Sequence, residues 1–98
     1  SPAVDVFKLL KKKGAKVTYH DPHVPQFDSD HHDGIASKPE NMVKSVALTN
    51  DAIKNADIVV ITTWHSEFRI EPIMEYANAI VDTRNATKGI SNPKVVRI

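Results

Sequence analysis

Apolar residues near the start of the chain recur with the period of a helix. Those at the spacing i, i+3, i+4 and i+7 are Ala3, Val6, Phe7 and Leu10. Ser1 followed by Pro2 has the residue types of an N-cap and a first helical position. Gly14 has the residue type favoured just after a helix end. The pattern therefore predicts a helix that opens the chain and ends before Gly14.

Three later runs have the residue types of strands. They cover residues 15–19, 58–61 and 79–81. Every residue in the run 58–61 is β-branched and apolar, which is typical of a strand buried on both faces of a parallel sheet. Residues 45–48 are a weaker strand candidate, and residues 95–98 are either an edge strand or a tail.

Two further helices are predicted between these runs. Thr49 or Asn50 has the residue type of an N-cap, and Pro72 that of a first helical position. The apolar residues expected to face inward are Ala52, Ile53 and Ala56 in one helix and Ile73, Met74 and Ala77 in the other. Residues 21–44 are polar and contain three prolines, so no regular element is predicted there.

The alternation of strands and helices predicts an α/β fold. Helices between strands at this spacing form βαβ units around a parallel sheet. The length suits one domain, so we expect residues 1–98 to form a Rossmann-like, three-layer domain with a mostly parallel sheet. A sheet of this type normally opens with a strand and a glycine-rich turn, whereas this chain opens with a helix. We therefore expect a fragment that lacks its first strand and associates through the exposed sheet edge.

Charge, hydropathy and cysteine content exclude several classes of function. Thirteen basic and twelve acidic residues give a formal charge of +1. A nucleic-acid-binding domain needs a concentrated basic face, so we expect no nucleic-acid partner. No apolar run approaches the ~20 residues that span a bilayer, so we expect no membrane segment. The chain has no cysteine, which excludes a disulfide, a thiolate metal site and a cysteine nucleophile, and fits a cytoplasmic protein.

Each predicted strand runs into a polar cluster. The clusters are His20-Asp21-Pro22, Thr62-Thr63-Trp64-His65 and Asp82-Thr83-Arg84-Asn85. If the strands are parallel, all three clusters lie at one edge of one sheet. Ligands of open α/β sheets bind at this carboxyl edge. The clusters are therefore the candidate site.

Arg84 is the strongest single candidate. Its guanidinium is a planar fork of donors that suits a phosphate or a carboxylate. A salt bridge to Asp82 or Asp57 is the alternative, and the sequence leaves both open. Thr62, Thr63 and Asn85 offer hydroxyl and amide groups at the same edge.

The aromatic and acidic members of the clusters have two interpretations each. His65 is either a ligand or acid–base group, or a structural histidine. Trp64 either stacks on a base or belongs to the core. Asp21 either accepts a ribose hydroxyl, as acidic residues do in dinucleotide folds, or forms an Asp-Pro turn. No G-x-G-x-x-G sequence accompanies Asp21, which favours the turn.

A histidine-rich segment invites a metal hypothesis. Its potential ligands are His20, His23, His31 and His32 with Asp28, Asp30 and Asp33. A zinc site needs three or four converging ligands held by rigid elements. Because no helix or strand is predicted in this segment, we expect no native metal site and keep metal binding as a lesser alternative. The chain also contains no P-loop or nucleophile elbow, so it shows no complete active site.

The ordered pieces together resemble one known family. The pieces are Ser1-Pro2-Ala3, Leu10 to Val17, Tyr19 to Pro25, Ala56 to Thr62 with His65 and Phe68, and Val81 to Asn85. Over roughly residues 1 to 90 the chain resembles the C-terminal, UDP-binding domain of the UDP-glucose/GDP-mannose dehydrogenase family. The Asp-Thr-Arg-Asn sequence at 82–85 and the Tyr-x-Asp-Pro-x-Val-Pro sequence at 19–25 look most like members that act on UDP-N-acetylhexosamines.

The resemblance implies a function for a longer parent enzyme. Such enzymes oxidise the sugar C6 hydroxyl to a carboxylate in two NAD-dependent steps, usually as homodimers. The family places NAD and a catalytic cysteine in other domains, so this chain by itself is expected to bind no NAD and to be inactive. Its expected role is to bind the UDP part of a UDP-sugar, with Arg84 at the family's arginine position. A stand-alone flavodoxin-like binding or regulatory module is the alternative.

Overall fold

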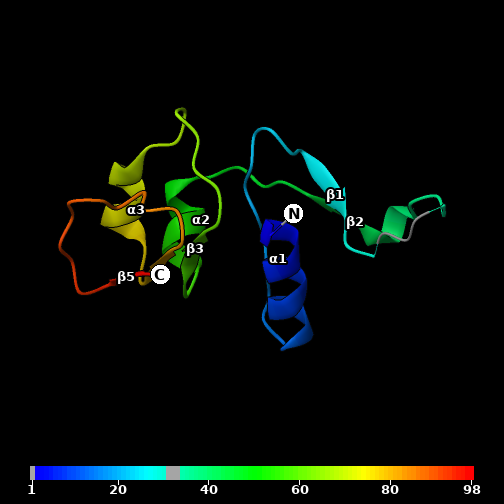
Figure 1. Ribbon diagram of the computed structural model, residues 1–98, viewed down its shortest axis with the longest axis horizontal. Coiled ribbons are helices and arrows are strands. Elements are labelled where there is room, and N and C mark those ends of the chain that lie inside the picture. Colours follow the sequence, from blue (N-terminus) through cyan, green and yellow to red (C-terminus); the bar gives the residue numbers. More distant parts are fainter. Residues whose placement is uncertain (1, 31–33) are drawn as a thin grey trace. The chain divides into compact units, whose positions relative to one another are not determined.

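The computed structural model describes residues 2–30 and 34–98. The chain, for which the sequence predicted one domain, divides into two compact units, Ser1–Ala47 and Leu48–Ile98 (Figure 1). Each unit has secondary structure of its own, so each is described by itself.

The first unit opens with the predicted helix. Helix α1 spans Pro2–Lys12, and Gly14 follows it at φ 95°, a conformation that favours glycine. Phe7 of this helix is buried against two other rings. Its ring centroid lies 5.1 Å from that of Phe27 and 6.4 Å from that of Tyr19, both edge-on. These three aromatic residues form the core of the unit.

The strands of the first unit differ from the prediction. Strand β1 (Gln26–Asp28) pairs antiparallel with β2 (Met42–Lys44), and a short 3₁₀ helix η1 (Pro39–Asn41) precedes β2. The prediction of no element within residues 21–44 is therefore wrong, as is that of a strand at 45–48. A three-residue strand among prolines is too short to produce a recognisable alternation.

The predicted strand at residues 15–19 is also wrong. This segment contains no strand, and its backbone bonds to the rest of the unit include those from the Val46 N–H to the Tyr19 carbonyl, 2.8 Å, and from the Ala15 N–H to the Leu10 carbonyl, 3.1 Å. The Tyr19 hydroxyl donates to the carbonyl of Val24 at 2.7 Å. The Tyr19 side chain thus ties the end of the segment to the unit, without the ladder of backbone bonds that a strand has.

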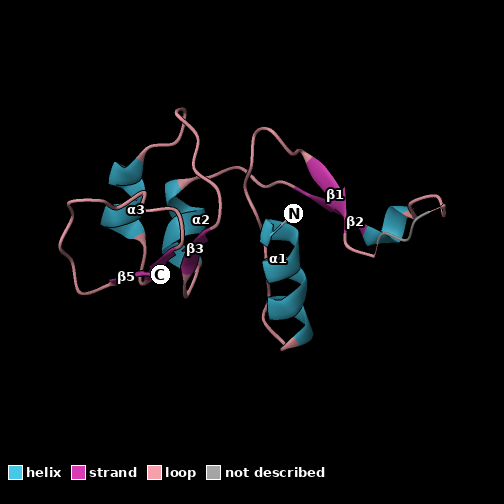
Figure 2. Cartoon of the chain, in the orientation of Figure 1, coloured by secondary structure: helices cyan, strands magenta, loops and turns pink. Residues whose placement is uncertain are grey.

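The second unit contains the predicted parallel sheet (Figure 2). Its elements are α2 (Asn50–Asn55), β3 (Val59–Ile61), α3 (Ile70–Tyr76), β4 (Ile80–Asp82) and β5 (Val95–Arg97). The strand order is β3-β4-β5, with both pairs parallel. The α/β class and the parallel sheet are confirmed, and the last run is an edge strand. Thr49 is the N-cap of α2, where its Oγ1 accepts from the Ala52 N–H at 3.0 Å.

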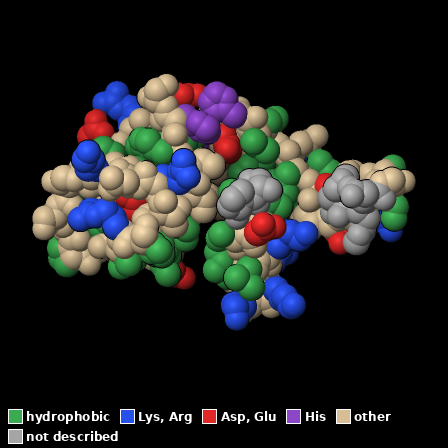
Figure 3. Space-filling model, viewed as in Figure 1, with side chains coloured by type: hydrophobic (Ala, Val, Ile, Leu, Met, Phe, Trp, Pro, Cys, Tyr) green, Lys and Arg blue, Asp and Glu red, His purple; other side chains and the backbone are tan. Residues whose placement is uncertain are grey.

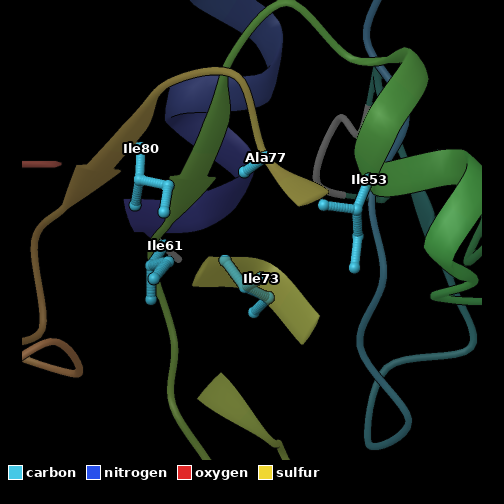
Figure 4. Packing of buried hydrophobic residues seen from close by; sticks show 5 residues of the cluster. All are labelled: Ile53, Ile61, Ile73, Ala77 and Ile80. Atoms are coloured by element: carbon cyan, nitrogen blue, oxygen red, sulfur yellow. The ribbon is translucent and has the colours of Figure 1, made fainter. Parts of the chain in front are cut away.

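The core of the second unit lies between the sheet and its two helices. The five buried apolar residues are contributed by α2, β3, α3 with its C-cap residue, and β4, and are Ile53, Ile61, Ile73, Ala77 and Ile80 (Figure 4). The helices contact each other, so they cover the same face of the sheet. Residues of the other face are less buried within this unit, and Ile58 and Val96 are 55% and 57% exposed. The expectation that the run 58–61 is buried on both faces therefore fails at its first residue.

Within the described residues, no helix is both long and apolar enough to cross a membrane.

Candidate functional site

Two of the three predicted clusters begin at neighbouring strand ends. Ile61 at the end of β3 is in register with Asp82 at the end of β4. The Thr83 N–H and Oγ1 both donate to the Ile61 carbonyl, at 3.1 and 2.7 Å, which fastens the two ends together. The loops that start at Thr62 and Thr83 therefore leave the same carboxyl edge, where α/β sheets bind ligands.

A buried carboxylate organises the loop that follows β4. Asp82 is fully buried and accepts four hydrogen bonds from residues later in the chain. Its Oδ1 accepts from the backbone N–H groups of Arg84 (3.0 Å) and Ala86 (3.1 Å). Its Oδ2 accepts from the Thr87 N–H (2.8 Å) and Oγ1–H (2.6 Å). The carboxylate thus serves as the centre around which residues 83–87 are wrapped.

These hydrogen bonds stabilise the charged form of Asp82. Burial by itself raises the pKa of a carboxyl group, but here the hydrogen bonds from Thr87, Arg84 and Ala86 outweigh it. The pKa of Asp82 falls from 3.8 to about 2. Asp82 is therefore ionised near neutral pH, although its side chain is excluded from water.

The Arg84 side chain is presented outward by this loop. Arg84 is exposed, and within the described part of the chain no residue accepts a hydrogen bond from its guanidinium or forms an ion pair with it. The structure therefore shows no salt bridge from Arg84 to Asp82 or Asp57. Asp82 instead accepts a hydrogen bond from the backbone N–H of Arg84. The guanidinium fork is open to solvent for an anion.

Backbone groups of the same loop are already committed. Successive N–H groups in a turn of this kind can form an anion-binding concavity, but three of them here donate to Asp82. Those three N–H groups are therefore not available to an added phosphate. Asn85 is the exposed neighbour of Arg84, and its φ of 60° is in the left-handed region, which asparagine tolerates better than most residues. Its side-chain amide is the second polar group available at the loop tip.

The loop after β3 combines partly buried polar groups with a small aromatic cluster. Thr62 and Thr63 are half-buried beside the strand end. The Trp64 ring packs against the core and lies 5.3 Å from the ring of Phe68, centroid to centroid. The His65 ring lies 5.2 Å from the same phenyl ring, and the Phe68 N–H donates to the His65 carbonyl at 3.0 Å. Trp64 thus has the core position that the sequence left open.

The third predicted cluster lies in the first unit. Asp21 accepts the His23 N–H on its Oδ1 at 2.9 Å, so the turn interpretation of this residue is the one observed. The Nδ1 of His20 lies 2.7 Å from the Val46 carbonyl. Burial and the charge of Asp21 raise the pKa of Tyr19, opposed by a hydrogen bond involving Ser45. Two of the three predicted clusters therefore follow strands of the parallel sheet, and the cluster at residues 20–22 follows no strand.

The histidine-rich segment gives no metal centre within the described residues. His31, His32 and Asp33 of the predicted ligand set lie outside the described residues. Among the remaining residues no group of three or more His, Asp or Glu side chains is placed to hold a metal ion. On the face shown in Figure 3, Lys and Arg side chains lie at several separate places.

The glycines do not form a dinucleotide-binding turn. Gly14, Gly34 and Gly89 lie in separate turns with φ of 95°, 78° and 81°. Gly34 lies between β1 and the three-residue 3₁₀ helix η1, and none of the three glycines lies between a strand and the start of an α-helix in the described structure. The residues therefore do not fit the pyrophosphate of NAD, which needs a glycine-rich turn at a helix N-terminus.

Two residues that sequence reasoning missed complete the support of the loop. Thr87 is fully buried beside Asp82, and Arg97 lies opposite Asp82 in register on β5. The Arg97 Nη1 donates to the Thr87 carbonyl (3.1 Å), the Thr87 Oγ1 (3.0 Å) and the Ile90 carbonyl (2.9 Å). Thr87 and Arg97 are ten residues apart in the sequence, so their contact can be seen only once the register of β5 is known.

Comparison with known proteins agrees with the resemblance found in the sequence. The family model for the "UDP-glucose/GDP-mannose dehydrogenase family, UDP binding domain" matches residues 1–89. Neither the curated proteins nor the solved structures gave a match. The match covers most of the chain and includes both loops at the carboxyl edge of the sheet. The chain belongs to the UDP-glucose/GDP-mannose dehydrogenase family, as its UDP binding domain.

Proposed function

We propose that this chain binds the UDP part of a UDP-sugar and positions it for oxidation at C6 by a parent nucleotide-sugar 6-dehydrogenase. Arg84 is assigned to the diphosphate, because a guanidinium fork matches phosphate oxygens. Thr62, Thr63 and Asn85 are assigned to hydroxyl and carbonyl groups of the nucleotide, and His65 to a further hydrogen bond. In such an enzyme NAD and the catalytic cysteine belong to other domains.

One observation carries the proposal. The exposed Arg84 guanidinium, which has no partner within the described residues, lies on a loop fixed by the buried Asp82 at the carboxyl edge of a parallel sheet. A fixed loop reduces the ordering entropy that ligand binding would otherwise cost. The family match adds the nucleotide class to this geometry.

The role proposed for the chain is orientation. Holding the remote nucleotide fixes the sugar relative to the oxidising groups of the parent enzyme. The substrate subtype we propose is a UDP-N-acetylhexosamine, from the Asp-Thr-Arg-Asn sequence at residues 82–85 and the Tyr-x-Asp-Pro-x-Val-Pro sequence at residues 19–25. NAD as acceptor and a homodimeric parent enzyme are proposed from the family.

Hydrogen exchange of the full-length enzyme tests where the nucleotide binds. With UDP present, we expect slower exchange in peptides that cover residues 62–65 and 83–85, because the ligand excludes water from both loops. Peptides at the amino edge of the sheet, residues 55–58 and 77–79, are the internal control and should not change. Protection confined to the amino edge, or protection of the two loops by NAD alone, contradicts the assignment.

A further inference from the structure

We propose that Arg97 is a positioning residue for the diphosphate site: it fixes the loop at residues 83–90 and thereby sets the affinity of Arg84 for UDP. The inference rests on the proposed function and extends it to a residue beyond the family match, which ends at residue 89. We do not place Arg97 in contact with the ligand, because its Nη1 donates to groups of the protein.

Arg97 holds the second half of the loop, as Asp82 holds the first half. The carboxylate binds the start of the loop through Arg84 and Ala86, and its middle through Thr87. The Arg97 Nη1 binds the middle of the loop and its far end through the carbonyls of Thr87 and Ile90. The loop is therefore held at both ends by side chains from neighbouring parallel strands.

Thr87 joins the two supports into one network. Its Oγ1 donates to Asp82 Oδ2 at 2.6 Å and accepts from Arg97 Nη1 at 3.0 Å. Since a hydroxyl has a single proton, the bond from Arg97 directs that proton toward the carboxylate. Removing Arg97 would take away the donor to the Thr87 hydroxyl, which would keep only its bond to Asp82, and the donor to the carbonyls of Thr87 and Ile90.

The consequence for Arg84 follows from its place in the chain. The Arg84 side chain has no partner within the described residues, so its position depends on its backbone, which is fixed through Asp82 and the loop. A looser loop would present the guanidinium over a wider range of positions. Binding would then have to order the guanidinium, and the entropy lost in doing so would weaken the affinity for the diphosphate.

The test uses the full-length enzyme with Arg97→Ala, Arg84→Ala and the double variant, and UDP as the probe. We expect Arg97→Ala to raise the Kd for UDP about tenfold, as loss of one loop anchor implies. In the Arg84→Ala background the same change should have little further effect, because both changes act through one side chain. Arg97→Lys, which keeps three donors on a shorter cation, should restore part of the affinity.

A second measurement needs no ligand. Amide exchange in a peptide covering residues 83–90 should accelerate in Arg97→Ala, while peptides covering β3 and β4 stay protected. Ile53→Val, a core change on α2 away from the loop, is the control for a general loss of stability. It should lower the melting temperature without changing the Kd for UDP.

The outcomes separate the two hypotheses. If Arg84→Ala weakens UDP binding and Arg97→Ala does not, the positioning role is wrong and the proposed function stands. If the two losses add in full, Arg97 contacts the ligand itself and the positioning role is also wrong. If Arg84→Ala leaves UDP binding intact, the proposed function fails together with any role of Arg97 in it, whatever the exchange data show about the loop.

Discussion

Replacement of Arg84 by alanine in the full-length enzyme is expected to raise the KM for the UDP-sugar by roughly 10- to 150-fold, the equivalent of ~1.5–3 kcal/mol for hydrogen bonds to a charged group. The KM for NAD should stay nearly unchanged. The reason is that the exposed guanidinium has no partner within the described residues, so the variant loses a ligand contact and little stability. Steady-state kinetics with each substrate varied in turn measures both values.

Two further variants sharpen this result. Arg84→Lys keeps the charge but not the fork, so it should recover only part of the lost affinity. Lys54→Ala removes one positive charge from the last turn of α2, next to the amino edge of the same sheet, and should leave both KM values unchanged. Equal effects of Lys54→Ala and Arg84→Ala would mean that only net charge matters, and a wild-type KM in Arg84→Ala would remove Arg84 from the site.

Replacement of Asp82 by alanine is expected to lower the free energy of unfolding by ~3–5 kcal/mol, because it leaves four donors around a buried site without their acceptor. Urea unfolding followed by circular dichroism measures the difference. Asp82→Asn is the matched variant that leaves no cavity. In this variant an NH₂ group replaces one carboxylate oxygen. Because NH₂ cannot accept hydrogen bonds from the N–H or O–H donors that face it, the variant too should lose stability. A wild-type unfolding free energy in Asp82→Asn would show that the bonds to the replaced oxygen contribute nothing.

The pKa of Asp82 also predicts how the stability depends on pH. Because the folded-state value of about 2 lies below the ordinary 3.8, the ionised group favours the folded state. Its contribution, about 2 kcal/mol, is complete above pH ~4 and is lost as the pH falls from ~4 to ~2. Asp82→Asn should lack this component of the acid transition. Parallel pH profiles for wild type and Asp82→Asn would contradict the assignment.

The second unit was largely predictable because its local and long-range preferences agree. The β-branched run ending at Ile61 suits only a buried strand, and Thr49 caps α2 whatever lies around it. The parallel pairing of β3 with β4 follows from the helix α3 that lies between them, whereas the connection from β4 to β5 contains no helix. The helix predicted to start at Pro72 starts at Ile70 instead, which lies within the usual spread of helix ends.

The first unit was predicted poorly because its order comes from side chains distant in sequence. The segment 15–19 has strand-forming residues, but it forms no ladder of backbone bonds and is tied to the unit by Tyr19. Strands β1 and β2 have three residues each, and their pairing depends on register, which sequence alternation over three residues cannot show.

The sequence predicted which edge of the sheet carries the candidate site, but not the residues that hold its loop in place. The sequence pointed to Arg84 by its place after a strand, and it treated Asp82 mainly as a possible salt-bridge partner. The observed role of Asp82 depends on hydrogen bonds to backbone groups up to five residues later, and that of Arg97 on a strand register. The presence of an Asp or an Arg in the sequence does not by itself reveal these hydrogen bonds.

A crystal structure of the full-length enzyme with UDP bound tests the central claim most directly. We expect the diphosphate at the carboxyl edge of β3 and β4, with the Arg84 guanidinium ~2.7–2.9 Å from phosphate oxygens and the Asp82 carboxylate still bound to the loop backbone. A diphosphate held elsewhere, with Arg84 turned toward solvent, would contradict it.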